Sequence, residues 1–263
     1  MSVETTSEIA SNGGAHDAPA VGLQRLVREF VDARQADCME VMAEYPDAHF
    51  DLAIVDPPYG INVGDNKSGM GRRKGDAKAK YKMGDWDSEP PADEYFRELR
   101  RVSKNQIIWG ANHYIERMAW NSPCWIIWDK LYSNDVTFAA VEMAWTSFRT
   151  TAKKFECTPL QAARIHPTQK PVKLYDWLLA KYAKPGQRIL DTHMGSGSIG
   201  IACHYYRCPL VTCEIDPDYF RAACDRIERE TAQADWYLPN GEVCHGAAPL
   251  ASPNGSAPTG KET

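Results

Sequence analysis

Long apolar runs are missing from this sequence of 263 residues. No stretch approaches the roughly 20 apolar residues that a membrane-spanning helix needs. The N-terminal segment MSVETTSEIASNGGAHDAPA also lacks the basic and apolar regions of a secretory signal. The sequence therefore predicts a cytoplasmic protein that does not act in a membrane.

Paired cysteines are missing as well. The eight cysteines are scattered along the chain, and none forms a CxxC pair. Cys203, Cys208 and Cys213 are evenly spaced, but no paired ligand motif accompanies them. We therefore expect buried free thiols and no metal site.

A net positive charge is missing too, since the formal net charge is −5. The charge is unevenly distributed, however, and a phosphate backbone responds to the local charge rather than to the net charge. One glycine-rich stretch holds seven cations against the single acid Asp76: Lys67, Arg72, Arg73, Lys74, Lys78, Lys80 and Lys82. The net charge therefore does not exclude a nucleic-acid partner.

The hydrophobic pattern predicts one domain over residues 21–237, between a disordered N-terminal segment (1–20) and a flexible tail (238–263). Strand-like and helix-like segments alternate inside it, which is typical of a mostly parallel sheet with helices on both faces. The expected strands lie within 50–55, 105–114, 123–130, 137–148, 188–191 and 210–216; the expected helices lie within 39–43, 91–102 and 170–183 and begin near 198 and 217. Two long loop-like segments, at about 61–90 and 148–165, interrupt this alternation.

The segment DTHMGSGSIG (191–200) follows an expected strand and precedes an expected helix. Its three glycines match the G-x-G-x-x-G pattern, and Glu214 ends the next strand, where a carboxylate can bind the hydroxyls of a ribose. The pattern indicates a ligand that contains adenosine. Asp191, beside the glycines, would repel a pyrophosphate and suits an ammonium group. The residues thus favour S-adenosylmethionine, with NAD as the alternative.

A second strand ends in FDLAIVDPPYG (50–60). The prolines stop the strand and stiffen the turn that presents Asp56 and Tyr59. Asp56 and the carbonyl of Pro57, which is fixed by Pro58, can accept the two N–H bonds of an exocyclic amine. Tyr59 offers a flat face to a flipped base. The turn therefore predicts methylation of a nucleobase amine. It contains no cysteine nucleophile, which argues against methylation of cytosine carbon 5.

Together, DPPYG, DTHMGSGSIG and HPTQKP (166–171) resemble the DNA adenine N6-methyltransferases of the β group, over about residues 35–230. The resemblance implies the Rossmann-like fold of the S-adenosylmethionine-dependent methyltransferases. It also implies a permuted motif order, in which the catalytic tetrapeptide precedes the glycine turn. It implies a catalytic pocket formed by Asp56, Pro57, Pro58 and Tyr59. The expected substrate is double-stranded DNA whose target base is flipped out, as in restriction–modification systems.

The same resemblance assigns the cofactor residues. The methionine end of the cofactor is expected to contact Asp191, Gly195, Ser196 and Gly197, and its carboxylate is expected near Thr168 and Lys170. The ribose is expected to contact Glu214. The adenine is expected to contact Asp37, with Cys38 beside it. Thr192 and His193 stand where the family often has Pro-Phe, and His193 is expected to pack as a flat ring against the methionine part.

The two long loops are expected to contact DNA. The first carries the seven cations named above, and the second contributes Arg149, Lys153 and Lys154. We expect His166 to be structural, and His113 to pack with some exposure. A homodimer is expected only by analogy. The alternatives are an N4-cytosine methyltransferase, a nicotinamide-dependent oxidoreductase and a catalytically silent cofactor-binding module.

Overall fold

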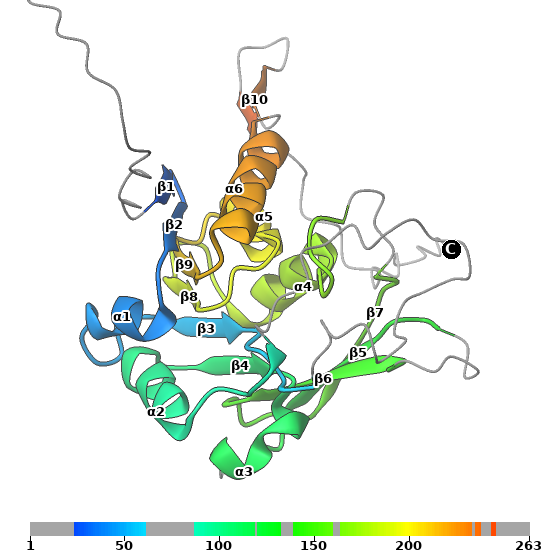
Figure 1. Ribbon diagram of the computed structural model, residues 1–263. Helices are drawn as coiled ribbons and strands as arrows, with labels where there is room; N and C mark the ends of the chain where they lie inside the picture. The colour runs from blue at the N-terminus through cyan, green and yellow to red at the C-terminus, as the bar shows by residue number, and fades with distance from the viewer. Residues whose placement is uncertain are drawn as a thin grey trace, which may run out of the picture.

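The computed structural model describes residues 24–61, 87–118, 120–132, 139–159 and 164–232, together with the backbone of 235–237 and 243–245. These residues form a nine-stranded sheet with the order β1-β2-β9-β8-β3-β4-β6-β5-β7 (Figure 1). The strands are β1 Arg25–Arg28, β2 Val31–Gln35, β3 Leu52–Val55, β4 Gln106–Trp109, β5 Trp125–Asp129, β6 Val141–Thr146, β7 Lys153–Glu156, β8 Ile189–Asp191 and β9 Leu210–Glu214.

Most neighbouring strands of this sheet run parallel. The continuous parallel block is β2-β9-β8-β3-β4, and β7 is parallel to β5, whereas β1, β6 and β5 introduce antiparallel pairs. The helices are α1 Cys38–Ala43, α2 Asp93–Val102, the 3₁₀ turn η3 Ala111–His113, α3 Ile115–Met118, α4 Val172–Tyr182, α5 Ser198–Tyr206 and α6 Pro217–Thr231. This arrangement confirms the predicted α/β class, with a mostly parallel sheet and helices on both faces.

Two hydrophobic cores lie on the two faces of the sheet. One contains the buried sides of α4, α5 and α6, and the other contains those of α1, α2 and α3. Figure 1 shows the two groups of helices on opposite sides of the strands. The buried residues of α2 are those that its helical spacing predicts: Tyr95, Phe96, Leu99 and Val102. Helices thus cover both faces and leave the carboxyl edge of the parallel strands for a site.

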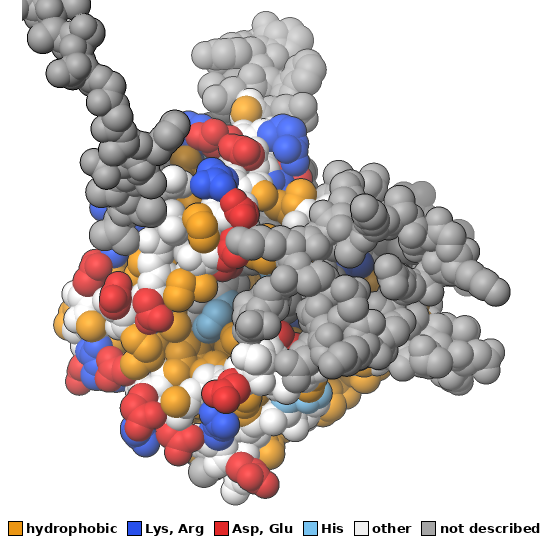
Figure 2. Space-filling view, viewed as in Figure 1, with side chains coloured by type: hydrophobic (Ala, Val, Ile, Leu, Met, Phe, Trp, Pro, Cys, Tyr) orange, Lys and Arg blue, Asp and Glu red, His pale blue; other side chains and the backbone are white. Residues whose placement is uncertain are grey.

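The exposed helical surfaces carry mixed charge. Figure 2 shows acidic and basic side chains interspersed over α6 and over α1 and α2. Ion pairs such as Arg221–Asp218 and Arg97–Glu94 lie on these helices. Among the described helices, none is both long and apolar enough to cross a bilayer.

The structure corrects three expectations. A charged hairpin, β1 and β2, precedes the first expected element; Asp32 pairs with Arg25 across it and with Arg34 along β2. The segment 148–165 is not a continuous loop, because β7 pairs with β5 and Phe155 packs on Trp177. Part of the expected tail forms β11 (Val243–His245), antiparallel to β10 (Asp235–Tyr237). Residues 1–23 lie outside the described residues.

The cysteines are thiols. All seven cysteines that the structure describes are free, and Cys124, Cys203, Cys208 and Cys213 are buried. Burial raises the pKa of the Cys208 thiol to about 11, which keeps it protonated.

Candidate active site

Four acidic side chains lie at the carboxyl edge of the parallel block. The strands β2, β9, β8 and β3 are consecutive neighbours. Asp37, Glu214, Asp191 and Asp56 stand, in that order, at or just past their carboxyl ends. The turn with Asp56 and the glycine turn are far apart in the sequence, and they meet at this edge because β3 pairs directly with β8.

The turn after β3 is fixed by a carboxylate from outside it. The N–H groups of Tyr59 and Gly60 donate to Asp87 Oδ1 over 2.6 and 3.0 Å. The Tyr59 hydroxyl in turn donates to Asp56 Oδ1 over 2.7 Å. Asp87 was missed in the sequence because it follows the basic stretch, 28 positions after Tyr59, with no motif to link the two.

The Tyr59 ring contacts two residues that follow β4. Gly110 has a φ of +68°, and a Cβ there would come within 2.0 Å of the ring. The His113 ring stacks on Tyr59 with the centroids 5.1 Å apart and the planes 14° apart. His113 is exposed, so it both packs and reaches the surface, as expected. Gly110 thus permits a close approach that no other residue allows.

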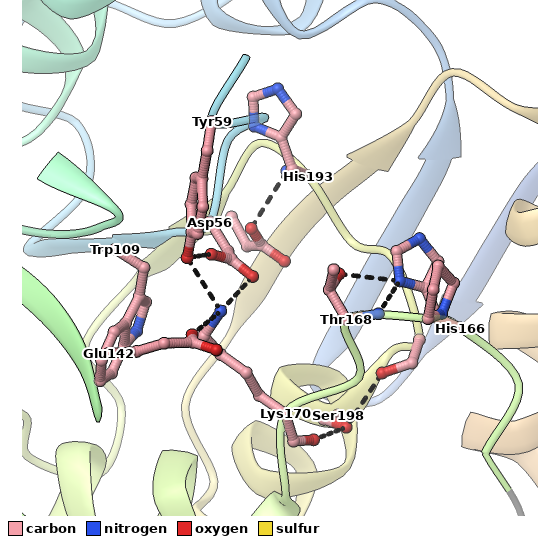
Figure 3. A network of polar contacts seen from close by, with 12 residues as sticks. Asp56, Tyr59, Trp109, Glu142, His166, Thr168, Lys170, His193 and Ser198 are labelled. Atoms are coloured by element: carbon pink, nitrogen blue, oxygen red, sulfur yellow. Dashed lines mark hydrogen bonds and ion pairs between the residues drawn. The ribbon is translucent and has the colours of Figure 1, made fainter. Parts of the chain in front are cut away.

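Lys170 lies at the centre of the polar network in Figure 3. Its ammonium contacts Asp56 Oδ2, Glu142 Oε2 at 3.0 Å and the Tyr59 hydroxyl at 3.3 Å, and the side chain is only 3% exposed. The contacts with Asp56 and Tyr59 are hydrogen bonds, whereas the contact with Glu142 is an ion pair, since Glu142 Oε2 has no hydrogen-bond partner among the described residues. In this arrangement the Lys170 ammonium faces the turn of Asp56.

Burial and ion pairing compete in this network. Burial raises the pKa of Asp56, although Lys170 acts against it. Burial also acts to raise the pKa of Glu142, but Lys170 and Lys130 outweigh it and lower that pKa to about 2. Burial acts to lower the pKa of Lys170, and the carboxylates of Asp56 and Glu142 raise it above its usual value. Glu142 and Lys170 are therefore charged at neutral pH.

The segment HPTQKP joins this network to the glycine turn. The Ser198 hydroxyl, at the start of α5, donates to the Lys170 carbonyl over 2.7 Å. His166 Nδ1 lies 3.1 Å from the Thr168 hydroxyl and accepts from the Thr168 N–H over 3.3 Å, as Figure 3 shows. The ring lies 3.8 Å from the position of a Cβ on Gly195. Burial lowers the pKa of His166 to about 4, so the neutral ring acts structurally, as expected.

The glycine turn depends on left-handed backbone and on close packing. Gly195 and Gly197 have φ values of +51° and +72°. The Gly195 N–H donates to Glu214 Oε2 over 2.9 Å, which fixes the turn to the end of β9. A Cβ on Gly200 would lie 2.8 Å from Ile227, so this glycine lets α5 pack on α6.

Asp191 is a buried carboxyl with neutral partners. The His193 N–H and the Thr212 hydroxyl each donate to it over 3.1 Å. Burial raises the pKa of Asp191 to about 7. The His193 ring contacts Thr192 through Nδ1 at 2.9 Å and packs edge-on against Tyr95, and burial lowers its pKa to about 4.

Asp37 caps a helix in this structure. Its side chain accepts from the Met39 N–H over 2.7 Å at the start of α1. Cys38 lies in the first turn, where burial and the charge of Asp37 raise its pKa to about 12. A capping Asp37 retains free acceptor positions, because a carboxylate has about four.

These residues suit a ligand that carries positive charge. Within the described residues, no Lys or Arg forms an ion pair with Asp37, Asp191 or Glu214. A buried acid without a cationic partner favours an incoming cation. A pyrophosphate would meet unfavourable charge at the same place. The three acidic side chains thus fit S-adenosylmethionine, which has an ammonium and a sulfonium, better than they fit a dinucleotide.

Three of the ten residues expected to contact DNA lie among the described residues. Lys67, Arg72, Arg73, Lys74, Lys78, Lys80 and Lys82 lie outside the described residues. Arg149 is exposed, and the Lys153 ammonium donates to the Thr151 hydroxyl over 2.8 Å. Lys154 is ion-paired with Asp129 and Glu156 at 2.8 and 2.6 Å. Its charge is thus already compensated, which weakens it as a phosphate ligand.

Comparisons of the sequence with known proteins agree with this chemistry. The family model described as DNA methylase, of the N6/N4 type, matches residues 112–225. YubD of Escherichia coli K12, named as a candidate methylase, is 26% identical over 231 residues, covering 78% of this chain and 96% of YubD. The type II methyltransferase M.HpaI of Haemophilus parainfluenzae is 31% identical over 65 residues, covering 25% of this chain and 21% of M.HpaI.

Solved structures share the fold. The M1.HpyAVI–SAM complex has a TM-score of 0.52 at 17% identity, covering 75% of this chain and 98% of that one. The cytosine-N4-specific PvuII DNA methyltransferase also has a TM-score of 0.52, at 12% identity, covering 81% and 94%. The family match and the methylase relative together support a DNA methyltransferase of the N6/N4 class.

Proposed function

We propose that this protein methylates the N6 amine of adenine in double-stranded DNA, with S-adenosylmethionine as the methyl donor and with the target base flipped out of the helix. The observation that carries the proposal is the position of Asp56. Its carboxylate stands on a rigid turn at the end of β3, beside the glycine turn that follows β8.

The proposed chemistry is positioning and electrostatic stabilisation. When bound, S-adenosylmethionine supplies a methyl group on a positively charged sulfur, which keeps the electron pair of the broken bond. Asp56 and the Pro57 carbonyl accept the two N–H bonds of the target amine and so free its lone pair for the new carbon–nitrogen bond. Asp56 then accepts the proton that the nitrogen releases. The raised pKa of this buried carboxyl suits it to hold that proton.

The neighbouring acids would bind the donor. Asp191, Gly195, Ser196 and Gly197 would hold the methionine end, and Glu214 the ribose hydroxyls. Asp37, with Cys38, would contact the adenine of the donor. Thr168 and His193 would line the methionine part.

The choice of adenine rests on the first residue of the tetrapeptide. Enzymes that this chain resembles carry DPPY where they act on adenine, and more often SPPY where they act on the N4 amine of cytosine. The fold does not separate the two, since the cytosine-specific PvuII enzyme has the same TM-score as the M1.HpyAVI complex.

Incubation with S-adenosylmethionine labelled in the methyl group, followed by nucleoside analysis of the DNA, tests the proposal. We expect the label in N6-methyladenine. Label in N4-methylcytosine would contradict the target base but keep the class of reaction. Tight binding of NAD without methyl transfer would instead favour an oxidoreductase, a reading that leaves the DPPY turn unexplained.

A further inference from the structure

We propose that Glu142 is a positioning residue, which takes over the Lys170 ammonium from Asp56 when the target base enters. This inference rests on the proposed function and deepens it. Glu142 belongs to no motif in the sequence, and it reaches the site from β6, a strand that runs antiparallel to β4.

One ammonium serves two carboxylates in this site. Lys170 contacts Asp56 Oδ2 and, over 3.0 Å, Glu142 Oε2. The other oxygen of Glu142, Oε1, lies 2.6 Å from the ammonium of Lys130, just past β5. Figure 3 shows Lys170 reaching up between Asp56, Tyr59 and Glu142. The four side chains thus form a row of alternating charge.

The contacts of Asp56 are at odds with its proposed role. Its Oδ1 accepts from the Tyr59 hydroxyl and its Oδ2 contacts Lys170. An adenine amine would donate to the same carboxylate, and an ion pair with Lys170 makes this carboxylate a weaker acceptor and a weaker base, so the contact with Lys170 competes with the target amine. Lys170 is 3% exposed. An ammonium released there without a counter-charge would be strongly unfavourable.

Glu142 removes this conflict. Its carboxylate already lies within ion-pair distance, so the Lys170 ammonium can leave Asp56 without losing a negative partner. Lys130 holds the second oxygen of Glu142 and keeps the first one directed at Lys170. The transfer changes no net charge in the site, and the incoming base is neutral.

Substituting Glu142 tests this arrangement. In Glu142→Gln the ammonium stays on Asp56, so we expect kcat to fall roughly tenfold to a hundredfold, the effect of one charged hydrogen bond. The affinity for S-adenosylmethionine, measured by calorimetry, should not change. Glu156→Gln is the matched control, because Glu156 pairs with the exposed Lys154 on the adjacent edge of the sheet.

The pH profile separates positioning from mere packing. The charge of Glu142 acts to raise the pKa of Asp56. Its removal therefore lowers that pKa, and the acidic limb of kcat moves to lower pH. Glu142→Asp keeps the charge and should leave that limb in place. Titratable and charged groups that act on Asp56 or contact it come from several elements: Tyr59, Tyr114, Glu142, Lys170, Tyr175 and Asp191.

The outcomes distinguish the two proposals. A wild-type protein that transfers no methyl group to DNA contradicts the proposed function. An active wild type with the same kcat and acidic limb in Glu142→Gln contradicts only the role of Glu142. If Glu142→Gln does not fold, Lys130→Gln decides, because it removes the cation that keeps Glu142 directed at Lys170: a lowered kcat supports the proposal, and a wild-type kcat contradicts it.

Discussion

The two halves of the site handle negative charge in opposite ways. On the side of β8 and β9, Asp191 and Glu214 are held by backbone N–H groups and a hydroxyl. On the side of β3 and β6, Asp56 and Glu142 are held by ammonium groups. Within the described residues, the first pair has no cationic partner and the second pair has two.

This difference matches the charges of the proposed ligands. Buried acids without a cationic partner lower the free energy of a bound cation, and the methyl donor is a cation. Where the charges of acids and ammonium groups cancel, a neutral nucleobase can bind at little electrostatic cost. We call the half with Asp56 and Glu142 the base side, and the half with Asp191 and Glu214 the donor side. We infer that the ion pairs of Lys170 and Lys130 keep the base side neutral, while the donor side stays negative. The predictions below test each half separately, from the largest expected effect to the smallest.

Asp56→Ala should have the largest effect. Methyl transfer should fall by roughly a hundredfold to a thousandfold or more, because the amine loses its charged acceptor. Binding of S-adenosylmethionine should persist, since Asp56 belongs to the base side. Single-turnover transfer and calorimetric binding measure the two effects, with the exposed Asp47→Ala as control. A variant that transfers at the wild-type rate would remove the assigned role.

Asp191→Asn should act on the other half. We expect the affinity for S-adenosylmethionine to fall roughly tenfold to a hundredfold, because a charged hydrogen bond is lost. In the wild type, the same affinity should decrease below pH 7, since the cation binds the ionised carboxyl and its pKa is about 7 without ligand. Calorimetry across pH 5–9 measures both. A pH-independent affinity would show that Asp191 does not face the ammonium.

The stability of the ligand-free protein should move in the opposite direction. Burial raises the pKa of the Asp191 carboxyl in the folded protein to about 7, from an ordinary value of 3.8. The native state therefore binds its proton more tightly, and this carboxyl lowers the free energy of unfolding as the pH rises from about 4 to 7. Asp191→Asn should abolish that part of the pH dependence in thermal melts.

Gly110→Ala should have a smaller effect, limited to the base side. A Cβ would overlap the Tyr59 ring, and φ at this position is +68°. The displaced ring should slow transfer by about tenfold through misplacement of the base. Donor affinity should stay unchanged. The measurement is kcat with KM for each substrate, and an unaltered kcat would show that Tyr59 does not position the base.

Local sequence patterns account for more of the half of the site at β8 and β9 than of the half at β3 and β6. Glycines, a strand-ending acid and the DPPY turn are local patterns, so residues 191–200 and 56–59 could be placed at strand ends. Lys170 belongs to a motif that the sequence shows, but its partner Glu142 belongs to none. Glu142 and Asp87 come from distant segments, and only the packing of β6 and of the residues before α2 brings them to the turn.

The fold shows the same division. Alternating apolar segments predicted β9, β8, β3 and β4 of the parallel block. The charged strands β1, β2 and β7 were missed; β1 and β7 are short edge strands, which gain their order from pairing rather than from their own apolar pattern. Phe155 anchors β7 through its contact with Trp177, a contact that no local pattern reveals.

The smallest predicted effect concerns this outer edge. Lys154 bridges Asp129 and Glu156, whereas Arg149 lies exposed before β7. Each phosphate contact contributes about 0.9 to the slope of log affinity against log salt. Arg149→Gln should therefore reduce that slope by about 0.9, and Lys154→Gln should leave it unchanged, because its charge is already neutralised by two carboxylates. Titrations of DNA at several salt concentrations measure both slopes. An equal reduction of the slope in the two variants would mean that DNA draws Lys154 away from Asp129 and Glu156. The ion-paired Lys154 would then be as available to phosphate as the exposed Arg149.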